Sequence, residues 1–178
     1  MLTYRFTFMP PDKERAHFMN YLTRHLSQLG ASVVAILISF AAAADNATPF
    51  PGTHVIKTGH SYTAMVEKLP KAVAKNKMGV VARASATLGA KKIGVTIPGN
   101  MVVMVFHPKF AVRMLEASVA SGIEAPLRFY ITENSDGTTT LTYRDPSSVF
   151  APYESKELDK MAKELDGIFA SIAADASS

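Results

Sequence analysis

Residues 101–106, Met-Val-Val-Met-Val-Phe, are apolar at every position. Successive side chains of a strand point to opposite faces, so this run predicts a strand with two apolar faces. Val102, Met104 and Phe106 would lie on one face, and the residues between them on the other. Two layers of protein or ligand are needed to cover such a strand, and the rest of the chain supplies apolar helices for only one.

Apolar residues recur at helical spacing in three further segments. Ser61 is placed to cap the first helix, and Pro70 is expected to kink it, because proline cannot donate the hydrogen bond that a helix interior requires. Residues 86–94 suit a short helix or a turn. We therefore expect helices at 62–77, at 108–121 and from about 154 to 172, and strands at 53–59, 79–85, 100–107, 127–133 and 138–144.

The last two of these strands form the clearest local pattern. Leu127, Phe129 and Ile131 alternate with polar residues in the first strand, and Asn-Ser-Asp-Gly at 134–137 is a typical turn. The pattern predicts an antiparallel hairpin with one apolar and one polar face. The polar face carries Arg128, Tyr130, Thr132, Thr140, Thr142 and Arg144.

The beginning of the chain has the composition of a signal peptide. Arg24 precedes an apolar run from Val33 to Phe40, and small residues of the Ala-x-Ala kind lead to Ala44. We expect cleavage near Ala44, and Met19 is a suitable start for the leader. The sequence predicts a signal-peptide region at 1–44, a linker at 45–52 and a single α+β domain at 53–178.

A membrane span is the alternative for the same segment. Residues 26–44 form a charge-free run of 19 residues, close to the roughly 20 that a spanning helix needs. The strongly apolar centre is only about eight residues long, which is typical of a signal peptide. We therefore expect a periplasmic or secreted protein with no membrane span after cleavage.

Composition excludes some classes of function. The chain has no cysteine among its 178 residues, which rules out disulfides, thiolate metal sites and a thiol nucleophile. The formal net charge is +4, but residues 1–44 hold four basic and two acidic residues, and 15 basic and 13 acidic residues remain without them. A net charge of +2 on the rest of the chain gives no reason to expect a nucleic-acid partner.

Three stretches follow in order the pattern of a known family: "SYTAMVEKL", "GVVARASATLGAKKIG" and "HPKFAVRMLEASVASGIEAPLRFYITENSDGTTTLTYRDP". They resemble the bacterial domain-of-unknown-function family three hundred and two over about residues 54–150. The resemblance implies a fold similar to one repeat of the TATA-binding protein. That fold is a two-layer α+β sandwich, with a mostly antiparallel curved sheet and helices on one face. The resemblance implies no established activity.

The chain departs from the family pattern at two places. Ser85-Ala86 stands where the family usually has Asp-His, and His107 stands where it usually has Asn before Pro108-Lys109. A site built from that Asp-His pair in relatives is therefore not expected in this chain.

Histidine and methionine residues offer one kind of chemistry. His54, His60 and His107 could together hold a zinc or copper ion, or one of them could bind haem iron. Their spacing matches no metal motif, and a structural role is the better interpretation of each. Methionines that follow the leader lie mostly on apolar faces, which favours core packing over copper handling. We predict no cofactor.

Polar groups near the hairpin offer another kind of chemistry. Asp145, before Pro146, is the best single carboxylate, although a turn residue that caps backbone donors is the better interpretation of it. Lys109, with the lysines at 91 and 92, could bind an anion. Arg128 and Arg144 are expected side by side on the polar face, where like charges repel unless an anion lies between them.

The leading hypothesis is a non-enzymatic exported module. It would pair with itself as a homodimer and bind a small ligand or an envelope protein on the open sheet face, with the hairpin's polar residues, Lys109 and Asp145 as the contact surface. A metal- or haem-dependent periplasmic enzyme or metal carrier that uses the three histidines is the alternative of another class. A surface protein without any ligand is the third.

Overall fold

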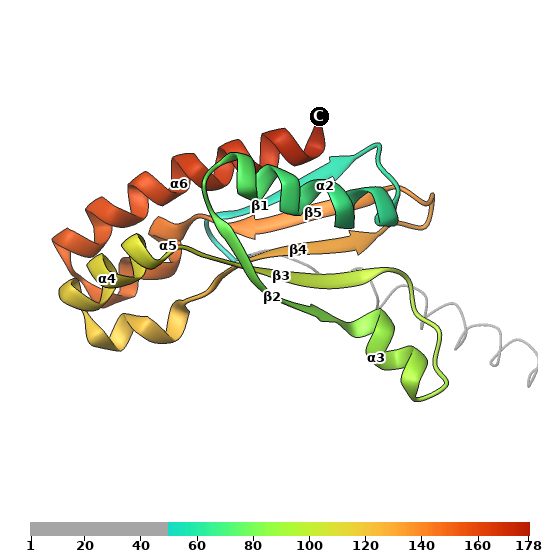
Figure 1. Cartoon of the computed structure of the whole chain (residues 1–178), viewed down its shortest axis with the longest axis horizontal. Helices are drawn as coiled ribbons and strands as arrows, with labels where there is room; N and C mark the ends of the chain where they lie inside the picture. Colours follow the sequence, from blue (N-terminus) through green and yellow to red (C-terminus); the bar gives the residue numbers. More distant parts are fainter. Residues whose placement is uncertain (1–49) are drawn as a thin grey trace, which may run out of the picture. The chain divides into compact units, whose positions relative to one another are not determined.

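The computed structural model describes residues 50–178, which form one sheet covered by helices on one face (Figure 1). The sheet has five antiparallel strands in the order β1-β5-β4-β3-β2. The predicted two-layer α+β fold with an antiparallel sheet is confirmed. The strands are β1 (Thr53–Thr58), β2 (Gly79–Ser85), β3 (Asn100–Phe106), β4 (Leu127–Glu133) and β5 (Thr139–Arg144).

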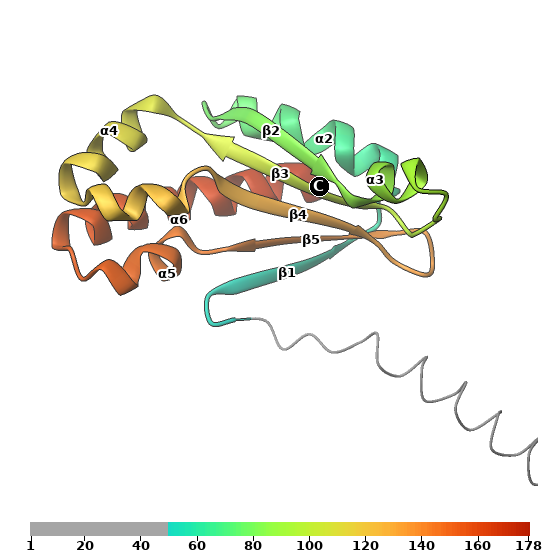
Figure 2. The same ribbon diagram turned by 90° about the horizontal axis from the view of Figure 1, so that it is seen from below.

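The helices form two groups. α2 (Tyr62–Lys75) and the long α6 (Lys156–Ser177) lie on one face of the sheet, and the shorter helices lie near its ends (Figures 1 and 2). The shorter helices are α3 (Ala86–Lys92), α4 (Pro108–Ala117), α5 (Pro146–Phe150) and the 3-10 helices η1 (Val119–Glu124) and η2 (Ala151–Tyr153).

Serine side chains begin both long helices. Ala64 N–H donates to Ser61 Oγ at 3.3 Å, as the sequence predicts, and Leu158 N–H donates to Ser155 Oγ at 3.4 Å. α2 continues through Pro70 and ends at Lys75, two residues before the predicted end. The caps fix where each helix begins, and the apolar stripe fixes which side faces the sheet.

The core lies between the sheet and the layer of α2 and α6. Phe129 of β4 stacks on Phe169 of α6 with ring centroids 4.8 Å apart, and the Tyr143 ring is tilted against both. Phe129 and Phe169 are fully buried. This aromatic group joins the centre of the sheet to the C-terminal helix.

Charged side chains tie the helices together at the surface. Lys75 Nζ and Asn76 Nδ2 donate to the Asp175 carboxylate at 2.6 and 2.9 Å, which links the end of α2 to the end of α6. These two hydrogen bonds lower the pKa of Asp175. Arg113 of α4 forms a two-bond pair with Glu164 of α6 and holds the pKa of that carboxyl below its usual value.

The predicted helix at 108–121 is wrong over its last four residues, 118–121. α4 ends at Ala117, Ser118 is extended, and η1 follows. Ser121 is fully buried, and its hydroxyl donates to the Ser118 carbonyl at 2.7 Å, a local bond that competes with a regular helix. α4 also lies beyond the end of β3 and packs on α6, so it does not cover the sheet face as the sequence suggested (Figure 2).

The sequence pattern also missed the short helices between β5 and α6. Pro146 is the first residue of α5, a position where its fixed φ and missing N–H are tolerated. Val149 and Phe150 are buried, and Ser147 N–H donates to Asp166 Oδ1 of α6 at 2.8 Å. The predicted start of the last helix at residue 154 is therefore early, because Glu154 is left-handed with φ 51° and Ser155 is the cap.

The signal-peptide region 1–44 and most of the linker 45–52 lie outside the described residues. Among residues 50–178, no helix is long and apolar enough to cross a membrane.

Truncation of Phe169 tests the aromatic core. Phe169→Ala should lower the free energy of unfolding by about 3–5 kcal/mol, because it removes a fully buried ring and leaves a cavity. Leu88→Ala, at a side chain that is 61% exposed, is the matched control and should stay within about 0.5 kcal/mol of the unmodified protein. Urea denaturation measures both, and equal values would contradict this assignment of the core.

Candidate functional site

The face of the sheet opposite α2 and α6 is the candidate site, and we call it the open face. Figure 2 shows it toward the viewer, with no helix of residues 50–178 across the middle of the strands. The strand register assigns the side chains that lie on it: Thr53, Val55, Lys57, Ala82, Ala84, Asn100, Val102, Met104, Phe106, Arg128, Tyr130, Thr132, Thr140, Thr142 and Arg144.

One row of this face crosses the whole sheet. The register aligns Val55, Thr142, Tyr130, Val102 and Ala84 on five successive strands. Val55 is 53% exposed and Tyr130 is 37% exposed. The alternate residues of β3 are buried, while Val102 and its neighbours on the open face are half-buried. The strand thus has the two apolar faces that its sequence predicts, and only one is covered by helices.

The polar residues predicted for this face differ in accessibility. Thr140 is only 8% exposed, and its hydroxyl donates to Oδ1 of Asn134, a residue of the hairpin turn, at 2.9 Å. Thr132 and Thr142 are half-buried. The Tyr130 hydroxyl accepts a hydrogen bond from Asn100 Nδ2 of the neighbouring strand. Tyr130 and Thr142 therefore remain near the centre of the face, and Thr140 does not contribute to contacts there.

A hollow of about 280 Å³ lies at the end of β4 and β5, and we call it the arginine hollow. The pairing of these strands ends at Phe129 and Tyr143, and Arg128 and Arg144 lie on opposite strands directly beyond that pair. Both arginines are exposed. The residues lining the hollow are Val102, Leu127, Arg128, Tyr130, Thr142, Tyr143, Arg144 and Val149.

The charge of the open face has one sign. Lys57, Arg128 and Arg144 are the ionisable residues that the register places on it, and all three are basic. Among the ion pairs of residues 50–178, none involves these three side chains. The Arg144 guanidinium lies 5.7 Å from the centroid of the Phe50 ring, a cation–π contact at the rim of the face.

Two residues predicted for the contact surface lie elsewhere. Lys109 is in the first turn of α4, away from the strands. Asp145 follows β5, but its side chain turns to His54, with Nε2 of the imidazole 2.7 Å from Oδ1 of the carboxylate. The expectation that Asp145 caps backbone donors is wrong, because the side chain makes no capping bond to α5.

The His54–Asp145 pair belongs to the helix side of the sheet. The imidazole stacks on the Tyr143 ring at 4.7 Å with an interplanar angle of 11°. Burial and the nearby Asp145 carboxylate raise the pKa of the Tyr143 phenol. The pair anchors β1 to the end of β5, since Asp145 N–H also donates to the Gly52 carbonyl at 2.7 Å.

The three histidines of the metal hypothesis are held in separate places. His60 Nε2 bonds the Ser178 carbonyl at 3.1 Å, and His107 Nδ1 accepts the Lys109 N–H at 3.1 Å as the cap of α4. His54 is engaged with Asp145. Among residues 50–178, no group of three or more His, Asp or Glu side chains is arranged to hold a metal ion.

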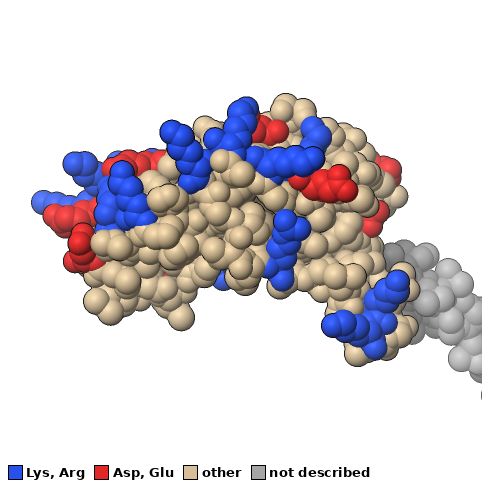
Figure 3. All heavy atoms as spheres, in the orientation of Figure 1, with Lys and Arg blue, Asp and Glu red and all other residues tan. Residues whose placement is uncertain are grey.

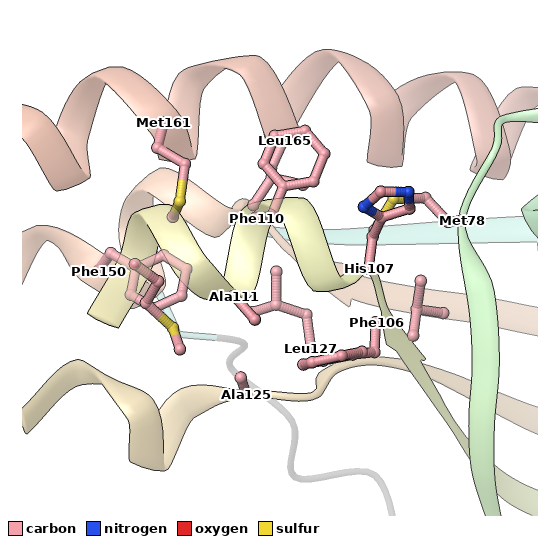
Figure 4. A pocket seen from close by; sticks show the side chains of 12 residues that line it. Met78, Phe106, His107, Phe110, Ala111, Ala125, Leu127, Phe150, Met161 and Leu165 are labelled. Atoms are coloured by element: carbon pink, nitrogen blue, oxygen red, sulfur yellow. The ribbon is translucent and has the colours of Figure 1, made fainter. Parts of the chain in front are cut away.

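A second cavity lies beneath α4 and α6, and Figure 4 shows its lining. Met78 lies beside the His107 ring at one end, whereas Met161 lies near Phe150 at the other. The free volume is about 30 Å³, which is far below the usual size of a ligand pocket, about 300 Å³ or more. This cavity is a packing gap of the core, and the predicted core role of most methionines is confirmed.

Residues 86–99, which we call the α3 arm, were not predicted as a surface feature. The arm projects from the sheet on the side opposite α2 and α6, below the strands in Figure 1. Leu88, Ile93 and Val95 are 61%, 78% and 47% exposed, and α3 buries no residue. Lys91 and Lys92 complete the helix, and in Figure 3 the arm carries basic but no acidic side chains. The signal in the sequence is a short helical segment whose apolar residues have no second element to face.

Comparison with known proteins identifies the family. Residues 54–174 match the model of Domain of unknown function DUF302. The chain belongs to the DUF302 family. The crystal structure of an uncharacterized conserved DUF302 protein from Bacillus stearothermophilus is similar, with a TM-score of 0.65 and 17% sequence identity. The match covers 72% of this chain and 99% of that one, and at this identity it shows a common fold. No curated protein matches the chain.

The two positions that were expected to depart from the family pattern lie at helix caps. Ser85 Oγ accepts the Leu88 N–H at 3.2 Å and thereby begins α3. His107 Nδ1 accepts the Lys109 N–H at the start of α4. Both side chains thus satisfy a backbone donor in the first turn of a helix.

Gly52 tests how the start of β1 is held against α5. It is left-handed with φ 75°, and an added Cβ would overlap the Ser148 side chain. Gly52→Ala should therefore lower the free energy of unfolding by more than about 1 kcal/mol. Gly59→Ala, where a Cβ meets nothing within 4 Å, is the control and should change it by less than about 0.5 kcal/mol. Thermal unfolding of both variants decides, and an unchanged Gly52 variant would refute the close packing.

Proposed function

We propose that this DUF302 protein is an exported, non-enzymatic binding module. The open face pairs with a second copy of the chain and binds a small ligand or partner protein. The observation that carries the proposal is the row from Val55 to Ala84, where no helix of residues 50–178 covers the second face of the interior strand β3. Uncovered apolar strand surface with a polar rim is typical of an interaction surface.

The energy of covering the face is sufficient for a stable pair. Burying about 400 Å² of apolar surface contributes on the order of 10 kcal/mol before the entropy of association is subtracted. Tyr130 lies near the centre of the surface and is of a residue type that is enriched at binding hot spots.

Charge restricts how two copies can pair. Arg128 and Arg144 lie at one end of the strands, and Asn100, Thr132 and Lys57 lie at the other. A two-fold axis along the strands would place arginines against arginines. An axis across the strands instead places the two arginines of one copy over the Lys57 end of the other, which lessens the repulsion.

The α3 arm supports the same arrangement. The arm extends from the Lys57 end of the sheet, on the open side (Figure 1), and its Leu88, Ile93 and Val95 are exposed. With an axis across the strands, the arm of each copy lies near the other copy's arginine end. This contact also brings Lys91 and Lys92 near the two arginines, a repulsion that a bound anion would offset. Both apolar surfaces of the chain then have a partner in the same contact.

The alternative functions have less support. A metal- or haem-dependent enzyme would need the histidines to meet at an open site, and each is engaged separately. A surface protein without any ligand predicts a protein that stays monomeric and binds nothing on the open face.

A charge in the central row tests the pairing. Val102→Lys adds a fourth positive charge to the open face and should weaken self-association at least tenfold, because the ammonium must be desolvated in the contact. Val112→Lys makes the same change at a 55% exposed position of α4 and should leave association unchanged. Sedimentation equilibrium over a range of concentrations measures both constants.

Two results would refute the self-association. The unmodified protein could remain a monomer at all concentrations, or Val102→Lys could dimerise as well as Val112→Lys does. Circular dichroism of both variants checks that the monomer fold is retained.

Export gives an independent test. Pulse-labelled cells should contain a precursor that is trimmed near Ala44, with the product in the periplasmic fraction or the medium, because the leader has the pattern of a cleaved signal. Full-length protein retained in the inner membrane would show that the apolar segment is an anchor.

A further inference from the structure

We propose that the arginine hollow binds a small amphipathic anion, with a carboxylate or phosphate group held by Arg128 and Arg144 and an apolar body against Val102 and Tyr130. This inference deepens the proposed function, because it names the class of ligand for the open face. It requires only one chain, since every residue lining the hollow comes from a single copy.

Among the ion pairs of residues 50–178, none involves either guanidinium group. The two groups lie on adjacent strands directly beyond the last paired residues, and both line the same hollow. Like charges on neighbouring strands are unfavourable, and a bound anion converts that repulsion into attraction. Guanidinium groups suit this role because their planar forks match the geometry of carboxylates and phosphates.

The nearest carboxylates are engaged elsewhere. Asp145 follows Arg144 directly, but its side chain bonds His54 on the helix side of the sheet. Asp166 accepts the Ser147 N–H at 2.8 Å. Both carboxylates thus bond other groups, and among residues 50–178 no ion pair occupies the position between the arginines.

The walls of the hollow define the rest of the ligand. Val102, Leu127 and Val149 are aliphatic, and Tyr130 offers both a ring and a hydroxyl. A bound inorganic anion would leave these apolar side chains exposed to water, whereas the apolar part of an organic anion would cover them. The volume of about 280 Å³ suits a molecule of one ring or a short chain, and not a polymer.

Calorimetric titration with benzoate tests the proposal. Benzoate should bind the purified protein with saturation, while acetate, which has the charge alone, and benzyl alcohol, which has the ring alone, should each bind at least tenfold more weakly. Arg144→Gln and Arg128→Gln should each weaken benzoate binding at least tenfold, the effect expected when a charged hydrogen-bond partner is removed.

Arg83→Gln is the matched control. Arg83 is exposed on β2, opposite Val103 in the register and therefore on the other side of the sheet. Its substitution changes the net charge by the same amount and should leave benzoate binding unchanged. Arg144→Lys keeps the charge but loses the planar fork of the guanidinium group, so it should give an intermediate affinity. It replaces Arg144→Gln as the test at this position if Arg144→Gln proves unstable.

The proposal is overturned if benzoate does not bind, if Arg144→Gln and Arg128→Gln both bind it as the unmodified protein does, or if acetate binds as tightly as benzoate. Sedimentation of the same samples measures self-association independently of benzoate binding, so the two proposals can fail separately. A dimer without benzoate binding would refute the ligand class alone, and a monomer that binds benzoate would refute the pairing alone.

Discussion

The structure depends on the interior strand β3, which is apolar on both faces. Met101, Val103 and Val105 of β3 enter the core beneath α2 and α6, and the Phe129–Phe169 stack on the neighbouring strand fixes that helical layer. The chain has one helical layer for two apolar faces. Because burial of the first face already supports the fold, the second face is available for a partner without loss of the core.

The charges follow the same division. On the helix side, polar pairs join segments that are distant in the chain: the ion pairs of Lys75 with Asp175 and of Arg113 with Glu164, and the hydrogen bond of His54 with Asp145. The low pKa values of Asp175 and Glu164 mean that these two links contribute at neutral pH and are lost as the pH falls through those values. On the open face the basic groups have no such partners among the described ion pairs. Arg128 and Arg144 repel each other at one end of the open face, and the centre of the face is apolar. The face therefore favours a partner that places a negative charge between the two arginines.

Much of the fold could be predicted from sequence, because it follows from periodic patterns. The apolar run of β3, the alternation in the hairpin and the Ser61 cap are local features. The site was harder to predict because it depends on where regular structure stops. The hollow exists because the pairing of β4 and β5 ends at Phe129 and Tyr143, and no periodicity marks that end. The Thr140 hydroxyl bonds Asn134, and the Asp145 carboxylate bonds His54. The alternation of polar and apolar residues along a strand does not predict either contact.

The central claim is that the open face is the surface covered on interaction. Hydroxyl-radical footprinting in dilute and concentrated solution tests it through Met104, whose thioether is readily oxidised and half-exposed on the open face, whereas Met114 and Met161 are buried. Oxidation of Met104 and Tyr130 should fall in concentrated solution, while that of Leu115, 46% exposed on α4, stays constant. Unchanged oxidation of Met104 and Tyr130, with protection of Leu115, would contradict the account and assign the interaction to the helix surface.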